Sequence, residues 1–218
     1  LINMNYFNQI EKEKLNPIYI YIYRDGRDVD LSFKKTIIGP KHSYFTAKKW
    51  LNDQIICEKI KTNVSRSRFI SVKYEDLILD PKKILSGICE KIKVKYNDKV
   101  LDYYKSEESK ASALAGQMWH NLSKPILKNN RSKFIKSLKK DELKIFESIA
   151  IKPLKNLGYN LLNNENDLIT KFSDLDIERY TKANSEIKLH TYKNANKKDL
   201  IQMEPFENFK KTLASKVF

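Results

Sequence analysis

The chain has 218 residues, 41% of them hydrophobic, which is enough to bury the core of one domain. Two cysteines and the lack of a long apolar run exclude a disulfide-stapled scaffold and a membrane span, so a cytoplasmic protein is expected. The net charge of +15 fits an anionic partner, but it also fits compositional drift, since Lys, Asn, Ile and Tyr are all abundant.

Only six of the 42 basic residues are arginines, so the positions of the arginines are more informative than the net charge. Arg offers a planar fork that matches the oxygens of a phosphate, whereas Lys is a point charge.

The first part of the chain predicts strands separated by helices. Residues 17–23 alternate β-branched and aromatic side chains, which is typical of a strand, and residues 27–37 follow as a helix. Residues 45–62 are predicted to form a second helix and residues 68–74 a second strand. This order predicts an α/β fold whose sheet is at least partly parallel.

The second part of the chain is predicted to be mainly helical. Asp80 and Pro81 begin a helix as its cap and first-turn residue, and residues 97–105 form another. Residues 106–134 are predicted to be irregular, and residues 138–157 to be helical. Beyond Tyr159, weak helical periodicity appears in residues 166–181 and 199–215.

Arg24 lies at the predicted carboxyl end of the first strand, where ligands bind in open α/β sheets. Ser32 follows eight residues later, on the next helix, and an Arg fork with a hydroxyl group can hold a phosphate. Alternatively, Arg24 pairs with Asp25 or Asp28 at the surface. Arg27 is assigned to the turn or to the surface.

Four motifs follow one another in the order known from one family. YIYRDGRDVDLSF resembles the 3′-phosphate-binding segment of sulfotransferases that use 3′-phosphoadenosine 5′-phosphosulfate (PAPS), with Gly26 where that family usually has Pro. RFISVKYEDLILDP resembles the second strand and the Tyr-Glu-Asp-Leu and Asp-Pro motifs of the family. WHNLSKPILKNNRSKFIKSL is similar to its basic loop, and LKNLGY to its closing Leu-Gly-Tyr.

This resemblance implies a parallel central sheet flanked by helices, in the P-loop NTPase-like architecture of sulfotransferases. The family's phosphate loop is not found, since no GxxxxGK[ST] motif exists and only 16 residues precede the first predicted strand. We therefore expect an architecture that lacks its N-terminal phosphate-loop portion. Residues 1–162 are interpreted as the C-terminal part of a sulfotransferase domain and residues 163–218 as a helical C-terminal extension.

The resemblance also implies roles for individual residues at the nucleotide. Arg24 and Ser32 would grip the ribose 3′-phosphate. Tyr74 would lie beside the adenine, or it is a core tyrosine at a strand end. Glu75 and Asp76 are expected to fix the local backbone and helix geometry.

The basic loop adds two candidates, Arg131 and Lys133, which would reach the 3′-phosphate or else are simply solvated. The family usually has a Gly and a Trp in this loop, where the chain has Ser132 and Phe134.

The implied function is the transfer of a sulfonate group from PAPS to a hydroxyl or amine of a small-molecule or carbohydrate acceptor. PAPS is the donor and no metal is expected. The base of the family and its phosphosulfate-binding Lys or Arg would lie upstream, so no catalytic residue is assigned and the chain alone is expected to be inactive.

The alternative is a non-catalytic remnant that binds anionic ligands or nucleic acid through its basic surface, with nucleic acid the less favoured partner. A P-loop phosphotransferase such as a nucleoside kinase is disfavoured, because it leaves the later motifs unexplained. The sequence indicates neither the acceptor nor the oligomeric state.

Overall fold

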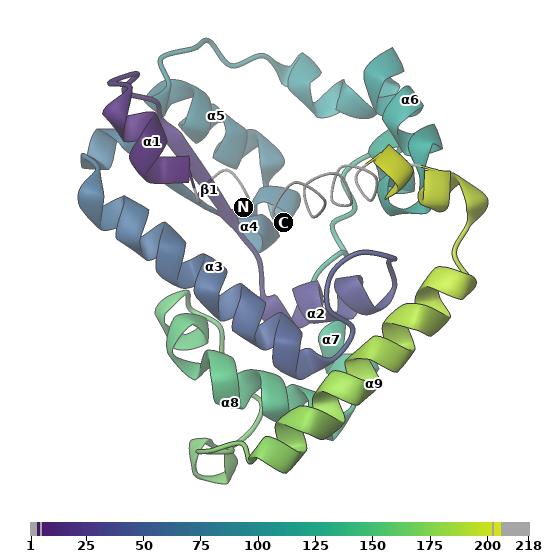
Figure 1. Ribbon diagram of the computed structural model, residues 1–218. Coiled ribbons are helices and arrows are strands. Elements are labelled where there is room, and N and C mark those ends of the chain that lie inside the picture. Colours follow the sequence, from purple (N-terminus) through teal and green to yellow (C-terminus); the bar gives the residue numbers. More distant parts are fainter. Residues whose placement is uncertain (1–3, 5, 202, 206–218) are drawn as a thin grey trace.

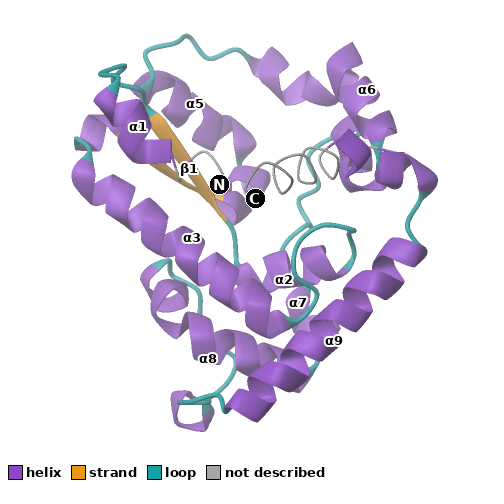
Figure 2. Cartoon of the chain, in the orientation of Figure 1, coloured by secondary structure: helices purple, strands orange, loops and turns teal. Residues whose placement is uncertain are grey.

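The computed structural model describes residues 4, 6–201 and 203–205, which form helices around a small parallel sheet (Figures 1 and 2). Within these residues, no helix has both the length and the apolar composition needed to cross a membrane. The elements are α1 (Phe7–Lys12), β1 (Tyr19–Tyr23), α2 (Gly26–Lys34), α3 (Ser43–Asn63), η2 (Arg66–Arg68), β2 (Phe69–Lys73), α4 (Tyr74–Leu79), α5 (Pro81–Lys91), η3 (Asp98–Lys105), α6 (Glu107–Ala115), η4 (Gln117–Ser123), α7 (Phe134–Ser137), α8 (Lys140–Asn156), η5 (Glu165–Asp167) and α9 (Asp174–Lys193).

The sheet confirms the two predicted strands and their parallel direction. Tyr19 lies opposite Phe69 and Tyr23 opposite Lys73, so the two strands end side by side. α3 packs on the face that carries the Tyr19 and Tyr21 rings, and α5 lies on the opposite side of the strands (Figure 1). The residues that follow the two strands are therefore held next to each other at one edge.

Helix α3 connects the three clusters of the core. Its first turn carries Tyr44, which packs with Tyr180 of α9, and its middle carries Trp50, which packs with Phe146 of α8. Its last turns carry Cys57, which packs against one face of the sheet. One helix of 21 residues thus holds the sheet, α8 and α9 together.

The structure corrects several predictions. The segment 106–134, predicted to be irregular, contains helix α6 and the 3₁₀ helix η4. The predicted helix 97–105 forms 3₁₀ rather than α-helical turns, over Asp98–Lys105. Ser106 begins α6 as an N-cap, its hydroxyl group accepting the N–H of Ser109, so a capping motif rather than an apolar stripe marks this helix.

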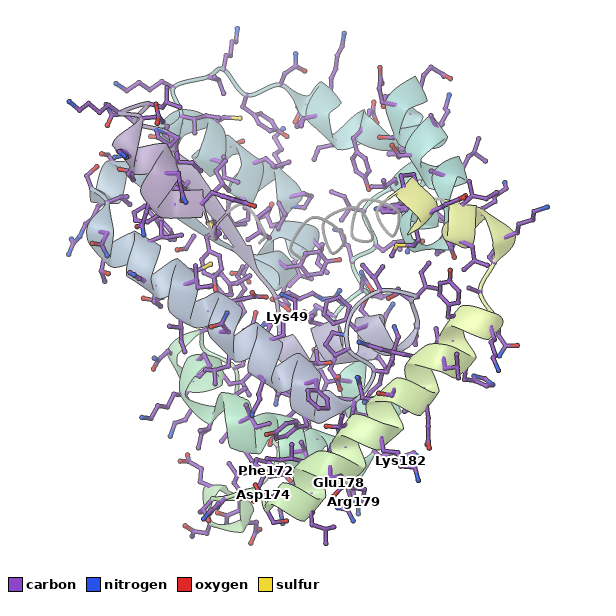
Figure 3. All side chains as sticks on the ribbon, viewed as in Figure 1. Lys49, Phe172, Asp174, Glu178, Arg179 and Lys182 are labelled. Atoms are coloured by element: carbon purple, nitrogen blue, oxygen red, sulfur yellow. The ribbon has the colours of Figure 1, made fainter. Side chains whose placement is uncertain are left out.

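The helix expected over residues 166–181 instead begins at Asp174, because Ser173 and Asp176 form a capping box there. Charged side chains of this helix, including Glu178, Arg179 and Lys182, are exposed (Figure 3). Of the predicted segment 199–215, residues 199–201 and 203–205 are helical, and the remainder lies outside the described residues.

Gly26 begins α2 at a point of close approach between helices. A Cβ atom placed there would lie 2.6 Å from Cζ of Phe146 and 2.7 Å from Cδ2 of Trp50. The turn after β1 can therefore pack onto α3 and α8 only because this residue has no side chain.

Gly26→Ala is expected to lower the free energy of unfolding by about 1–3 kcal/mol, because the added methyl group overpacks the core. Urea unfolding followed by circular dichroism measures the change. Gly87→Ala is the matched control, since a Cβ atom at Gly87 in α5 would have no neighbour within 4 Å. This control should stabilise the protein by about 0.5–1 kcal/mol, and effects of the same sign at both positions would contradict the packing at Gly26.

His42 joins the start of α3 to α9. Its Nδ1 accepts the N–H of Tyr44 at 3.3 Å, and its ring stacks on Tyr180 with the centroids 4.4 Å apart. Oδ1 of Asn184 accepts the N–H groups of Lys41 and His42 at 2.8 and 3.2 Å. Burial, and secondly the charge of Lys34, lower the pKa of His42 below 6.5.

Stability should therefore fall as the pH drops below 6.5 towards the folded-state pKa of His42, because the unfolded chain takes up the proton first. His42→Asn keeps a side-chain cap but removes the titrating group, so its unfolding free energy should depend less on pH between 7 and 5. Urea unfolding at a series of pH values tests this, with His190→Asn on α9 as the control. Equal pH dependence in His42→Asn and the unmutated chain would contradict the prediction.

Candidate functional site

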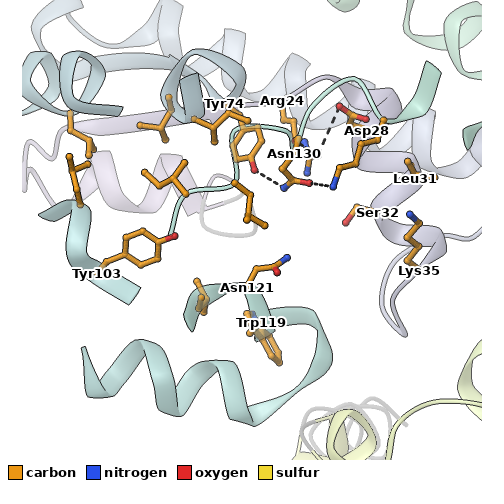
Figure 4. A pocket seen from close by; sticks show the side chains of 18 of the residues that line it. Arg24, Asp28, Leu31, Ser32, Lys35, Tyr74, Tyr103, Trp119, Asn121 and Asn130 are labelled. Carbon is orange, nitrogen blue, oxygen red and sulfur yellow. Dashed lines mark hydrogen bonds and ion pairs between the residues drawn. The ribbon is translucent and has the colours of Figure 1, made fainter. Parts of the chain in front are cut away.

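A pocket of about 710 Å³ opens at the edge where the two strands end (Figure 4). Segments far apart in the sequence form its wall: the residues that follow each strand, α2, α5, η3, η4 and the loop before α7. Its lining comprises Arg24, Asp28, Leu31, Ser32, Lys35, Tyr74, Leu77, Ile78, Leu85, Val100, Leu101, Tyr103, Trp119, Asn121, Leu122, Ile126, Leu127, Asn130 and Lys133.

Arg24 and Tyr74 come together because each directly follows one strand of the parallel pair. The Cζ atom of Arg24 lies 4.7 Å from the centroid of the Tyr74 ring, a cation–π contact. Nη2 of Arg24 donates to the carbonyl oxygen of Asn130 at 2.9 Å, and it lies 4.0 Å from Oδ2 of Asp28. The guanidinium is thus fixed at the polar end of the pocket.

The beginning of α2 is fixed by buried charges. Asp25 caps the helix by accepting the N–H of Arg27, and its carboxylate also binds the Arg27 guanidinium. Arg27 is 2% exposed and bonds Glu147 of α8 as well, so the expectation that it serves the turn is met, while a surface position is wrong. Burial alone would lower the pKa of Arg27, but the bonds to Asp25 and Glu147 raise it.

The end of α2 is fixed by a buried lysine. Nζ of Lys41 donates to the carbonyl oxygens of Phe33 and Ile38 at 2.6 and 2.8 Å, and also to that of Thr36. Lys41 is 1% exposed, and burial lowers its pKa to about 8. With both ends of α2 held, the helix presents a fixed face to the pocket.

That face carries Ser32 and Lys35, three residues apart and therefore neighbours on the helix surface. The adjacent Lys34 points elsewhere and pairs with Asp30 and Glu142, each at 3.0 Å. Lys35 makes no such ion pair within the described residues, so its charge is available to the pocket (Figure 4).

Asp28 attaches the basic loop to α2. Its carboxylate accepts the N–H of Ser132 at 2.6 Å and that of Phe134 at 3.0 Å. Ser132 has a φ of +54°, the left-handed region that favours glycine, at the position where the resemblance leads us to expect Gly. Phe134, which replaces the Trp, is 3% exposed. The loop therefore has a backbone conformation that suits the expected motif.

Glu75 holds the backbone, as predicted, and does not face the pocket. Its Oε1 accepts the N–H of Asp25 at 3.0 Å, and its Oε2 accepts the hydroxyl of Tyr159 at 2.8 Å. Burial and then the charge of Glu75 raise the pKa of Tyr159. This pair links the Tyr-Glu-Asp-Leu motif to the Leu-Gly-Tyr motif.

Four of the five residues predicted to bind the nucleotide line the one pocket: Arg24, Ser32, Tyr74 and Lys133. Arg131, the fifth, is exposed and does not line it. Within the part of the chain that the structure describes, no His, Cys, Asp and Glu side chains cluster in a way that could hold a metal ion.

Sequence reasoning missed Asp28, Lys35 and Asn130 as residues of the pocket. Helical spacing could have indicated Lys35, three residues after Ser32, whereas Asp28 was considered only as an ion-pair partner of Arg24. The sequence contains no comparable signal for Asn130, whose partners are far away in the chain.

The sequence model of the sulfotransferase family matches residues 3–98 of the chain. This match confirms the predicted resemblance to the sulfotransferase family over these residues. The matched part includes both strands, Arg24, Ser32 and Tyr74, whereas the basic loop lies beyond it. A comparison with curated proteins found no match.

Ser132→Gly is expected to raise the free energy of unfolding by about 0.5–1 kcal/mol, because glycine adopts a positive φ without steric cost. Ser137→Gly, at an exposed helical position of α7, is the control and should lower it by about 0.5 kcal/mol. Urea unfolding measures both changes. A loss of stability in Ser132→Gly would contradict the backbone conformation of the loop.

Proposed function

We propose that the chain is the nucleotide-binding part of a sulfotransferase that uses PAPS, and that the pocket holds the 3′-phosphate and the adenine. The carrying observation is that Arg24, Ser32, Tyr74 and Lys133 line one pocket although they span 110 residues of the sequence. The family match supports sulfonate transfer as the type of reaction, and the matched residues include Arg24, Ser32 and Tyr74.

The polar end of the pocket suits a phosphate dianion. Arg24 supplies a fork of N–H donors, and its buried Nε has no acceptor within the described residues. Lys35 adds a positive charge and Ser32 a hydroxyl group at the same end (Figure 4). Lys133, which is bonded to Asn130, adds a second charge. The one carboxylate in the lining, Asp28, is already bonded to two backbone N–H groups.

The other end of the pocket suits a flat apolar group such as a purine. Its wall is formed by aliphatic side chains of α4, α5, η3 and the loop after η4, with the rings of Tyr74, Tyr103 and Trp119. The volume of about 710 Å³ lies within the range typical of cofactor sites.

PAPS supplies an activated sulfonate group, and the bond from its sulfur to the phosphate oxygen breaks as a bond to the acceptor oxygen or nitrogen forms. The acceptor is a hydroxyl or amine of a small molecule or carbohydrate, and its proton must go to a base. The described lining contains no His or Glu. We therefore assign this chain the binding and orientation of the nucleotide, and expect no turnover from it alone.

We further propose that β1 and β2 belong to a larger parallel sheet of the P-loop kind. Ile20 and Ile22 of β1 are 41% and 51% exposed, whereas parallel sheets normally have both faces covered. An additional strand and its helix would bury these side chains.

Arg24→Ala is expected to weaken the binding of adenosine 3′,5′-bisphosphate by about 10- to 100-fold, because a hydrogen bond to a charged group contributes about 1.5–3 kcal/mol. Isothermal titration calorimetry on the 218-residue chain measures the affinity. Arg179→Ala is the matched control, since the Arg179 side chain is 70% exposed on α9, and it should leave the affinity unchanged.

The same titration separates this function from general anion binding. Adenosine 5′-phosphate, which lacks the 3′-phosphate, should bind the unmutated chain more weakly and should be little affected by Arg24→Ala. Equal binding of both nucleotides, with a steep loss of affinity as salt is added, would overturn the proposal in favour of a non-catalytic binder of anions.

A further inference from the structure

Asn130 contacts three of the residues assigned to the nucleotide. Its carbonyl oxygen accepts from Nη2 of Arg24 at 2.9 Å, and its Oδ1 accepts from Nζ of Lys133 at 2.9 Å. Its Nδ2 donates to the hydroxyl oxygen of Tyr74 at 2.7 Å. Figure 4 shows Asn130 between Tyr74 and Asp28 at the polar end of the pocket.

These bonds join parts of the pocket that no short segment of the chain connects. Arg24 follows β1, Tyr74 begins α4, and Lys133 lies in the basic loop. The Asn130 side chain fixes the position of Lys133, an exposed lysine with four rotatable bonds that would otherwise sample many conformations. It fixes the Tyr74 ring by its hydroxyl group while Arg24 stacks on the ring.

The neutral amide matters as much as its position. Asp28 lies 4.0 Å from Arg24 and already places one carboxylate beside the cations. A second carboxylate in the place of the Asn130 amide would offset the charges that attract a phosphate. An amide accepts the same N–H donor without neutralising it, so Lys133 keeps its charge for the ligand.

We propose that Asn130 is a positioning residue for the ribose 3′-phosphate, acting through Lys133 and Tyr74. Its carbonyl oxygen and its Oδ1 accept from the N–H donors of Arg24 and Lys133, and the phosphate oxygens replace them as acceptors when the nucleotide binds. This inference rests on the proposed function, because the ligand is the 3′-phosphorylated nucleotide. In this role Asn130 holds the Lys133 and Tyr74 side chains in place before the nucleotide binds, so that less conformational entropy is lost on binding.

Asn130→Asp keeps the shape and can keep both side-chain hydrogen bonds, with Tyr74 donating instead of accepting. It should weaken adenosine 3′,5′-bisphosphate binding by about 10-fold or more, because the new charge repels the phosphate. Asn129→Asp is the matched control, since it makes the same change in the same loop at an exposed position outside the pocket. This control should change the affinity by less than about 3-fold.

A double-mutant cycle tests whether Asn130 acts through Lys133. Asn130→Ala should weaken binding by about 3- to 10-fold in the unmutated background, and by much less when Lys133 is already Ala. Adenosine 5′-phosphate should bind each variant about equally, because a positioning role for the 3′-phosphate does not affect it. Urea unfolding of every variant shows whether the fold is retained.

The outcomes distinguish this inference from the function on which it rests. If the unmutated chain prefers the 3′-phosphorylated nucleotide and Arg24→Ala removes that preference, the proposed function holds. Under that condition, additive effects of Asn130→Ala and Lys133→Ala, or equal effects of Asn129→Asp and Asn130→Asp, would overturn the role of Asn130 alone. If the unmutated chain shows no preference for the 3′-phosphate, the proposed function itself fails.

Discussion

The site depends on one buried cation, the guanidinium of Arg27. It donates to both oxygens of Asp25, to Glu147 of α8 and to the carbonyl oxygen of Asn160, and it lies 4.2 Å from the centroid of the Phe134 ring. Removing one partner of such a buried pair leaves an uncompensated charge, which costs about 3–5 kcal/mol. The start of α2, α8 and the basic loop are therefore fixed relative to one another by the same group.

This arrangement separates the charges of the chain into two sets. The carboxylates of Asp25, Asp28, Glu75 and Glu147 are buried and are satisfied by backbone N–H groups, hydroxyl groups or Arg27. The cations of the pocket are left with few acidic partners, so a positive site exists beside a largely acidic interior. The excess of positive charge in the pocket thus arises because most nearby carboxylates are buried and bonded elsewhere, and not only from the net charge of +15.

Features set by neighbouring residues could be predicted from the sequence, and features set by distant residues could not. The strand at residues 17–23 and the Arg24–Ser32 spacing are local, whereas the positive φ of Ser132 was not predicted. The burial of Arg27 depends on Glu147, 120 residues away, and no local pattern indicates it. The same applies to Asn130, whose role appears only when three separate segments meet. Short capped helices such as α6 lack the apolar periodicity that prediction relies on.

Three of the six arginines in this chain with 36 lysines make contacts that suit a guanidinium group. Arg24 stacks on Tyr74, Arg27 binds both oxygens of Asp25, and Arg68 binds both oxygens of Glu11. The two carboxylate contacts need a flat group with several N–H donors in one plane, which an ammonium group cannot supply. Arg24 combines its contact with the Tyr74 ring with an N–H bond to the carbonyl oxygen of Asn130. Lysine suffices where a point charge is enough, as at Lys35 and Lys133 in the pocket. If drift towards lysine shaped the composition, arginine persisted at Arg27 and Arg68 because a lysine cannot bind both oxygens of a carboxylate in this way, and at Arg24 in the pocket because one planar group serves two partners at once.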